Sequence, residues 1–102
     1  AKFNPDWFIK KGNLIIMVET KDDSQIADPD AENVGKYRAS IEHFKELNNE
    51  LSNEGIDISY KPCFITPIDY DNFFKVLVSG DIKKFNSKLD VSLSGYGKVQ
   101  SK

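Results

Sequence analysis

The sequence predicts a small domain of the mixed α/β (α+β) class, in which a central mixed sheet is flanked by helices. Two short segments rich in apolar and branched residues flank a Gly-Asn turn, which is typical of a β-hairpin. A long segment with apolar residues at helical spacing follows, and then another short apolar segment. This order of hairpin, helix and strand indicates a mixed domain. The 102 residues suffice for one modest hydrophobic core, so residues 1–102 are expected to form a single domain.

The hairpin is expected to consist of strands at residues 3–10 and 14–21, joined by a turn at residues 11–13. Within the turn a glycine precedes an asparagine, as a two-residue turn of type II′ requires.

The long helix is expected from about Asp30 to Asn53, because apolar residues recur there at intervals of three and four. Residues 22–30 form an acidic loop before it, in which Asp28 and Pro29 suit an N-cap and a first turn. Gly55 is expected to end the helix.

The second half of the chain is expected to hold one strand and one short helix. The strand is predicted at residues 58–66, and Pro62 within it indicates an edge strand or a bulge. Asp69 is expected to cap a helix that ends at Val78. Residues 94–102 carry glycines and serines and are expected to form a frayed tail.

Composition favours a protein of the cytoplasm. The apolar fraction of 39% and the charged fraction of 29% are typical of soluble globular proteins. The longest apolar run, residues 14–18, is too short to cross a membrane. A lone cysteine, Cys63, fits a reducing compartment, and its apolar neighbours predict a buried, inert thiol. The first residue is not methionine, so we expect a piece of a longer polypeptide.

The two-residue turn also predicts which residues face each other. Lys11 pairs with Leu14, and continuing the register places Asp6 directly opposite Glu19. Since strand side chains alternate between two faces, Lys21 is expected on the same face as Glu19.

Two carboxylates that face each other across a strand pair repel, and a divalent cation between them removes that penalty. Carboxylate oxygens without a Cys/His cluster favour Mg²⁺, with Mn²⁺ as the alternative. We therefore expect Asp6, Glu19 and the backbone carbonyl of Thr20 to bind Mg²⁺. Asp6, Glu19 and Lys21 are the candidate catalytic residues, with Lys21 orienting or helping to deprotonate the attacking water and neutralising phosphate charge.

The pattern by itself is weak, because the chain contains a second Pro-Asp pair (Pro29-Asp30) and a second acid-x-Lys triplet (Asp81-Ile82-Lys83). The other interpretation is that Asp6, Glu19 and Lys21 are ordinary residues of a half-exposed strand. Spacing and register leave both interpretations open.

The amino-acid sequence around these residues resembles that of a known family. Phe3-Asn4-Pro5-Asp6-Trp7, followed by Ile16-Met17-Val18-Glu19-Thr20-Lys21, is similar to the C-terminal endonuclease domain of the restriction (Res) subunits of type III restriction-modification enzymes. That family belongs to the PD-(D/E)xK nuclease superfamily. Its following helix carries an acid, a lysine and a His-Phe pair, which Glu32, Lys36 and His43-Phe44 match, so the resemblance covers residues 3–66.

The resemblance implies a PD-(D/E)xK restriction-endonuclease-like core and Mg²⁺-dependent cleavage of double-stranded DNA. It also implies a helicase-like ATPase domain on the same polypeptide, which uses ATP, and a partner methyltransferase (Mod) subunit that reads the DNA sequence. A net charge of −2 agrees with other domains or subunits holding the duplex, since DNA-binding modules are usually basic.

The chain departs from the family in two ways. Asp22 stands where the family usually has glycine, and Asp23 follows it; these acids either bind a second cation or belong to a solvated loop. The superfamily also places a helix and a strand before the Asp strand, and this sequence has neither, either because they were cut away or because the parent protein lacks them. Their absence leaves an open sheet edge, which favours a homodimer.

Other residues carry two interpretations each. Lys36 and Arg38 are candidates for DNA-phosphate contacts, but Glu32 and Lys36 also fit an ordinary helical ion pair. Trp7, Phe73 and Phe74 are expected in the core rather than as base-stacking platforms. The alternative functions are a non-catalytic interaction domain with a nuclease-like fold, and a DNA repair or recombination nuclease with the same chemistry.

Overall fold

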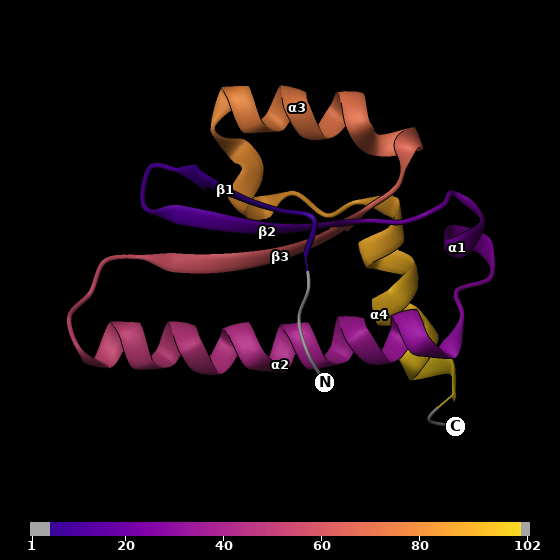
Figure 1. Cartoon of the computed structure of the whole chain (residues 1–102), viewed down its shortest axis with the longest axis horizontal. Coiled ribbons are helices and arrows are strands. Elements are labelled where there is room, and N and C mark those ends of the chain that lie inside the picture. Colours follow the sequence, from indigo (N-terminus) through magenta and orange to yellow (C-terminus); the bar gives the residue numbers. More distant parts are fainter. Residues whose placement is uncertain (1–4, 101–102) are drawn as a thin grey trace.

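The three strands of the chain form one mixed sheet in the order β1-β2-β3 (Figure 1). The computed structural model describes residues 5–100, with side chains described up to residue 95, so Phe3 and Asn4 lie outside the described residues. β1 (Trp7–Lys11) and β2 (Leu14–Thr20) are antiparallel. β3 (Ser59–Ile65) runs parallel to β2. The expected small mixed α/β domain is thus confirmed.

The hairpin has the register that its turn predicts. Lys11 pairs with Leu14 across the two-residue turn Gly12-Asn13. Gly12 has a φ of +60°, and no described non-glycine residue, Asn13 included, has a positive φ. A positive φ at only the first turn residue is the mark of type II′. The pairs that follow are Lys10 with Ile15, Ile9 with Ile16, Phe8 with Met17, and Trp7 with Val18.

Helices cover both faces of the sheet (Figure 1). α3 (Tyr70–Ser79) lies over one face, and α2 (Ala31–Asn53) and α4 (Lys88–Gln100) lie over the other. A short helix, α1 (Ser24–Ala27), occupies the segment expected to be a loop. Two 3₁₀ turns, η1 (Pro67–Asp69) and η2 (Asp81–Lys84), precede and follow α3. No helix in the described part of the chain is long and apolar enough to cross a membrane.

Both ends of α2 follow from local chemistry. The N-cap is Asp30 and not the expected Asp28, because the Asp30 carboxylate accepts a hydrogen bond from the backbone N–H of Asn33 at 2.8 Å. At the other end Gly55 has a φ of +73° and donates its N–H to the carbonyl of Ser52. The N–H of Ile56 donates to the carbonyl of Leu51, which completes a Schellman motif. The prediction that Gly55 ends the helix is confirmed.

α4 contains residues 94–100, which the sequence predicts to be part of a frayed tail. Its start is a capping box in which the Ser87 hydroxyl accepts from the Asp90 N–H at 2.9 Å and Asp90 accepts from the Ser87 N–H at 3.2 Å. Leu89 and Leu93 are fully buried. The helix therefore contributes to the core rather than extending from it.

The core consists of two clusters, one on each face of β2. Ile16 and Val18 pack with Cys63, Ile65 and Phe73 on the α3 side. Full burial of such apolar side chains contributes about 1.5–3 kcal/mol each. The second cluster, on the side of α2 and α4, consists of Met17, Val34, Phe44, Phe64, Leu89 and Leu93. Cys63 has no exposed surface and burial raises the pKa of its thiol, so the predicted buried, inert thiol is confirmed.

The free edge of β3 is closed by side chains. Asn48 of α2 donates to the carbonyl of Tyr60 and accepts from its N–H, at 2.9 and 2.7 Å. Two residues on, Pro62 has no N–H to offer, as an edge position favours. The N–H of Phe64 donates to Asp90 at 2.9 Å, and the Ser87 hydroxyl donates to the Phe64 carbonyl.

We expect Asp90 to make stability depend on pH between about 4 and 6. Burial raises the pKa of Asp90 to about 6, from an ordinary 3.8, while hydrogen bonds from Phe64 and Ser87 oppose this rise. The folded state then binds more protons than the unfolded state in this window, so the free energy of unfolding falls as pH rises. The loss is at most on the order of 3 kcal/mol.

Urea unfolding followed by circular dichroism at several pH values measures this. Asp90→Asn removes the titrating group, so its free energy of unfolding is expected to lack the fall. Asp81→Asn, at an exposed acid in η2, is expected to keep it. An equal fall in the wild type and in Asp90→Asn would assign the effect to another group.

Candidate active site

The residues predicted to act together gather at the C-terminal end of β2. Thr20 is the last residue of the strand and Lys21 follows it. Lys21 donates its backbone N–H to the carbonyl of Ile65 at 2.9 Å, which ties this end of β2 to β3. Asp6 reaches the same place from the residue before β1.

Asp6 does not face Glu19 across the hairpin as the register predicts. The ladder ends at the pair of Trp7 and Val18, and the N–H of Asp6 donates to the carbonyl of Val18 at 3.0 Å. A direct pairing would set two carboxylates against each other, which is unfavourable. Asp6 lies instead where two donors of Thr20 meet its carboxylate.

The Asp6 carboxylate is held by Thr20 through two hydrogen bonds. Its Oδ2 accepts from the Thr20 backbone N–H at 2.8 Å and from the Thr20 hydroxyl at 2.7 Å. The backbone hydrogen bond is the main cause that lowers the pKa of Asp6, followed by the hydroxyl, and the charge of Lys21 adds a smaller effect. Asp6 is therefore a fixed anion at neutral pH, with Lys21 close enough to influence it.

Glu19 and Lys21, the two neighbours of Thr20 in sequence, form an ion pair with each other. The distance from Lys21 Nζ to Glu19 Oε2 is 3.1 Å, and both side chains are largely covered, at 23% and 12% exposure. They share a face of the strand because they are two residues apart. The two charges compensate each other, and the ion pair holds the Lys21 ammonium next to the Glu19 carboxylate.

The carbonyl of Thr20 is directed toward the side of the strand on which Asp6 lies. In an extended strand the N–H and C=O of one residue point to the same neighbour, and the Thr20 N–H points to Asp6. Asp6 and the Thr20 carbonyl are thus two oxygen donors on one side of β2. Among the described residues no group of three or more His, Cys, Asp or Glu side chains is arranged to hold a metal ion.

Asp22 and Asp23, which follow Lys21, differ in their contacts. Asp23 accepts a hydrogen bond from the N–H of Ile68 at 3.2 Å, which connects the segment after β2 to η1. Asp22 is exposed. The hydrogen bond to Ile68 gives Asp23 a structural role in the loop, which agrees with the interpretation that it belongs to a loop rather than to a second cation site.

The candidate phosphate-binding residues lie on α2. Lys36 forms the expected i,i+4 ion pair with Glu32, at 3.8 Å. Arg38 is exposed. Within the described part of the chain, neither is joined to Asp6, Glu19 or Lys21 by a hydrogen bond or ion pair.

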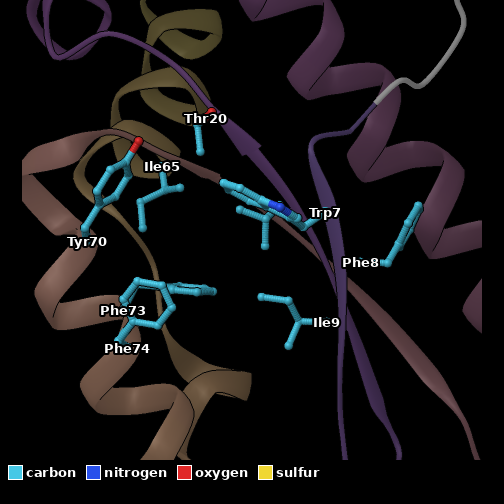
Figure 2. A pocket seen from close by; sticks show the side chains of 9 residues that line it. Trp7, Phe8, Ile9, Thr20, Ile65, Tyr70, Phe73 and Phe74 are labelled. Carbon is cyan, nitrogen blue, oxygen red and sulfur yellow. The ribbon is translucent and has the colours of Figure 1, made fainter.

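An apolar cavity of about 390 Å³ opens next to Thr20, between β1 and α3 (Figure 2). Its lining includes Trp7, Ile9, Thr20, Tyr70, Phe73 and Phe74. Phe73 is 3% exposed and belongs to the core, as expected. Trp7 and Phe74 are 58% and 56% exposed, so their expected place in the core was wrong. Within the described part of the chain the cavity between β1 and α3 stays open, which leaves both side chains exposed, and residue alternation along a strand does not predict this.

A comparison with protein-family models gives no match for this chain, and neither do comparisons with curated proteins and with solved structures.

Thr20→Val is expected to raise the pKa of Asp6 toward its ordinary value of 3.8, because the variant removes one of the two donors to the carboxylate. The backbone N–H remains, so the rise is partial. Carboxyl carbon shifts followed by NMR during an acid titration measure it. Thr66→Val is the matched control, since the Thr66 hydroxyl is buried without a hydrogen-bond partner. An unchanged Asp6 pKa in Thr20→Val would contradict the assigned contact.

Proposed function

We propose that this chain is a Mg²⁺-dependent endonuclease domain that cleaves DNA phosphodiester bonds as part of a type III-like restriction-modification enzyme. The observation that carries the proposal is the cluster at the end of β2. A fixed, charged Asp6 carboxylate lies against Thr20, and the ion pair of Glu19 and Lys21 lies on either side of that residue in sequence. Two carboxylates can hold a metal ion that assists phosphodiester hydrolysis, and a lysine can neutralise charge on the phosphate.

The proposed ligands are Asp6, Glu19 and the Thr20 carbonyl. Hydrogen bonds to Thr20 use Asp6 Oδ2, which leaves Oδ1 for a cation. Hard oxygen donors of this kind suit Mg²⁺, or Mn²⁺ in its place. A bound Mg²⁺ ion lowers the pKa of a coordinated water and stabilises charge on the phosphate.

Lys21 has the role of the basic residue. Its ion pair with Glu19 holds the ammonium beside the proposed ligands, where it orients the attacking water and neutralises phosphate charge. The Asp6 pKa, lowered by Thr20, keeps that carboxylate ready for a cation at neutral pH.

The fold supports the proposal at a coarser level. The PD-(D/E)xK core implies a mixed sheet flanked by helices, and the chain has a mixed three-stranded sheet with helices on both faces. Because the net charge of the chain is −2, we expect other parts of the enzyme to bind most of the DNA backbone. We place those parts in a helicase-like ATPase domain that uses ATP and in a methyltransferase (Mod) subunit, all in the cytoplasm.

Two observations favour a second function, that of a non-catalytic interaction domain. Glu19 is paired with Lys21, and large apolar side chains, among them Trp7, Phe8 and Phe74, are exposed on or near β1. Exposed apolar groups that gather in one place mark interaction surfaces. A nuclease domain with such a surface satisfies both observations, whereas an interaction domain leaves the arrangement of Asp6 unexplained.

Plasmid cleavage by the parent enzyme, with its methyltransferase partner, Mg²⁺ and ATP, tests the proposal. Asp6→Ala and Lys21→Ala are expected to lower the cleavage rate at least about 100-fold, the usual scale for losing an acid–base or electrostatic group. ATP hydrolysis and the circular dichroism spectrum are expected to be unchanged.

The second acid-x-Lys triplet supplies matched controls. Asp81→Ala and Lys83→Ala change the same residue types in η2, away from the proposed site, and both variants are expected to cut at the wild-type rate. If Asp6→Ala and Lys21→Ala also cut at that rate, the proposal is wrong and the interaction-domain function takes its place.

A further inference from the structure

The two outer edges of the sheet, on β3 and on β1, differ in whether their backbone groups are hydrogen-bonded. On β3 the outward-facing groups of Tyr60 and Phe64 are bonded to side chains of Asn48, Ser87 and Asp90. These contacts close that edge to any further strand. The outer edge of β1 has no such cover among the described residues, although it carries two large apolar side chains, Trp7 at 58% exposure and Phe8 at 57%.

The register tells which groups of β1 face outward. A two-residue turn makes Lys11 and Leu14 a hydrogen-bonded pair, so Ile9 and Trp7 also bond to β2. The alternate residues Phe8 and Lys10 therefore direct their N–H and C=O groups away from the sheet. Any strand that joins this edge must form its hydrogen bonds with Phe8 and Lys10.

The charges of β1 favour a second copy of the same strand. Lys10 and Lys11 lie at its C-terminal end, and the Asp6 carboxylate lies at its N-terminal end. An antiparallel copy brings the basic end of each strand to the acidic end of the other. A parallel copy would set like charges side by side, which is unfavourable.

We propose that two copies of this chain pair through β1 in antiparallel orientation about a two-fold axis at Phe8. In this register Phe8 faces the partner's Phe8 as a hydrogen-bonded pair, and Lys10 lies near the partner's Asp6, whose N–H donates to Val18 within its own sheet and therefore makes no bond across the interface. Trp7 faces the partner's Ile9 on the side of α3. The two sheets become one continuous sheet of six strands.

The apolar cavity beside β1 fits this arrangement. Trp7, Phe8 and Ile9 line the cavity together with Tyr70 and Phe74 of α3, and the Phe8 ring itself points to the other side of the strand (Figure 2). Pairing at β1 brings the partner's Trp7 and Ile9 to the rim of the cavity on one face, and the two Phe8 rings together on the other. Exposed apolar surface is removed from water on both faces.

Self-association is measured by sedimentation equilibrium of the 102-residue chain at concentrations up to about 1 mM. A concentration-dependent dimer is expected. Phe8→Glu sets two like charges opposite each other and is expected to weaken dimerisation at least about tenfold. Val91→Glu, at a 60% exposed valine of α4, is the matched control and is expected to dimerise as the wild type does. A chain that stays monomeric throughout overturns the proposal.

Cysteine cross-linking tests the register. Hydrogen-bonded antiparallel partners lie about 5.5 Å apart at Cα, so Phe8→Cys is expected to form a disulfide-linked dimer on mild oxidation. In the same register the Cα atoms of the two Lys10 residues are about 14 Å apart, so Lys10→Cys is expected to stay unlinked. Cys63 is buried and does not compete. Linking of Lys10→Cys with none of Phe8→Cys would contradict the two-fold axis at Phe8. Neither readout depends on cleavage, so this proposal and the nuclease proposal fail separately.

Discussion

The central strand β2 is buried on both faces, and the rest of the domain is arranged around that constraint. Ile16 and Val18 require cover on one face and Met17 requires it on the other, which the two hydrophobic clusters supply. The type II′ turn at Gly12-Asn13 sets the register that allows both faces to be covered. A shift by one residue would exchange the faces of β1 and bring Lys10 to the cavity side. The same register brings Asp6 to the end of β2.

The second organising feature is the junction of α4 with β3. Asp90 and Ser87 satisfy the backbone of Phe64 and at the same time cap α4. One acid thus closes a sheet edge, starts a helix and lies buried with a raised pKa. Burial of a charged carboxylate is costly, and the backbone N–H groups of Phe64 and Ser87, which donate to Asp90, offset part of that cost.

Local chemistry explains which elements the sequence predicts well. Gly12 predicts the hairpin register, Gly55 predicts the end of α2, and Pro62 indicates an edge strand, because each acts through its own backbone. α4 escapes sequence analysis because its glycines and serines disfavour a helix, while buried Leu89 and Leu93 stabilise it through tertiary packing. Ser87 and Asp90, at capping-box spacing, are the signal that identifies its start.

The candidate site is predictable to the same extent. The nearness of Asp6, Thr20 and Lys21 follows from the hairpin, but the position of the Asp6 carboxylate does not. That position depends on a competition between pairing opposite Glu19 and bonding to Thr20, which strand alternation alone does not decide. The exposure of Trp7 and Phe74 likewise depends on what lies outside β1, a tertiary property.

Paramagnetic broadening by Mn²⁺ in amide NMR spectra of the chain measures directly whether a cation binds at the end of β2. We expect low concentrations of Mn²⁺ to broaden the signals of Asp6, Glu19, Thr20 and Lys21 first, excess Mg²⁺ to restore them, and Asp6→Ala to remove the effect. Broadening centred on the exposed acids of other loops, or no selective broadening, would contradict a metal site at these residues.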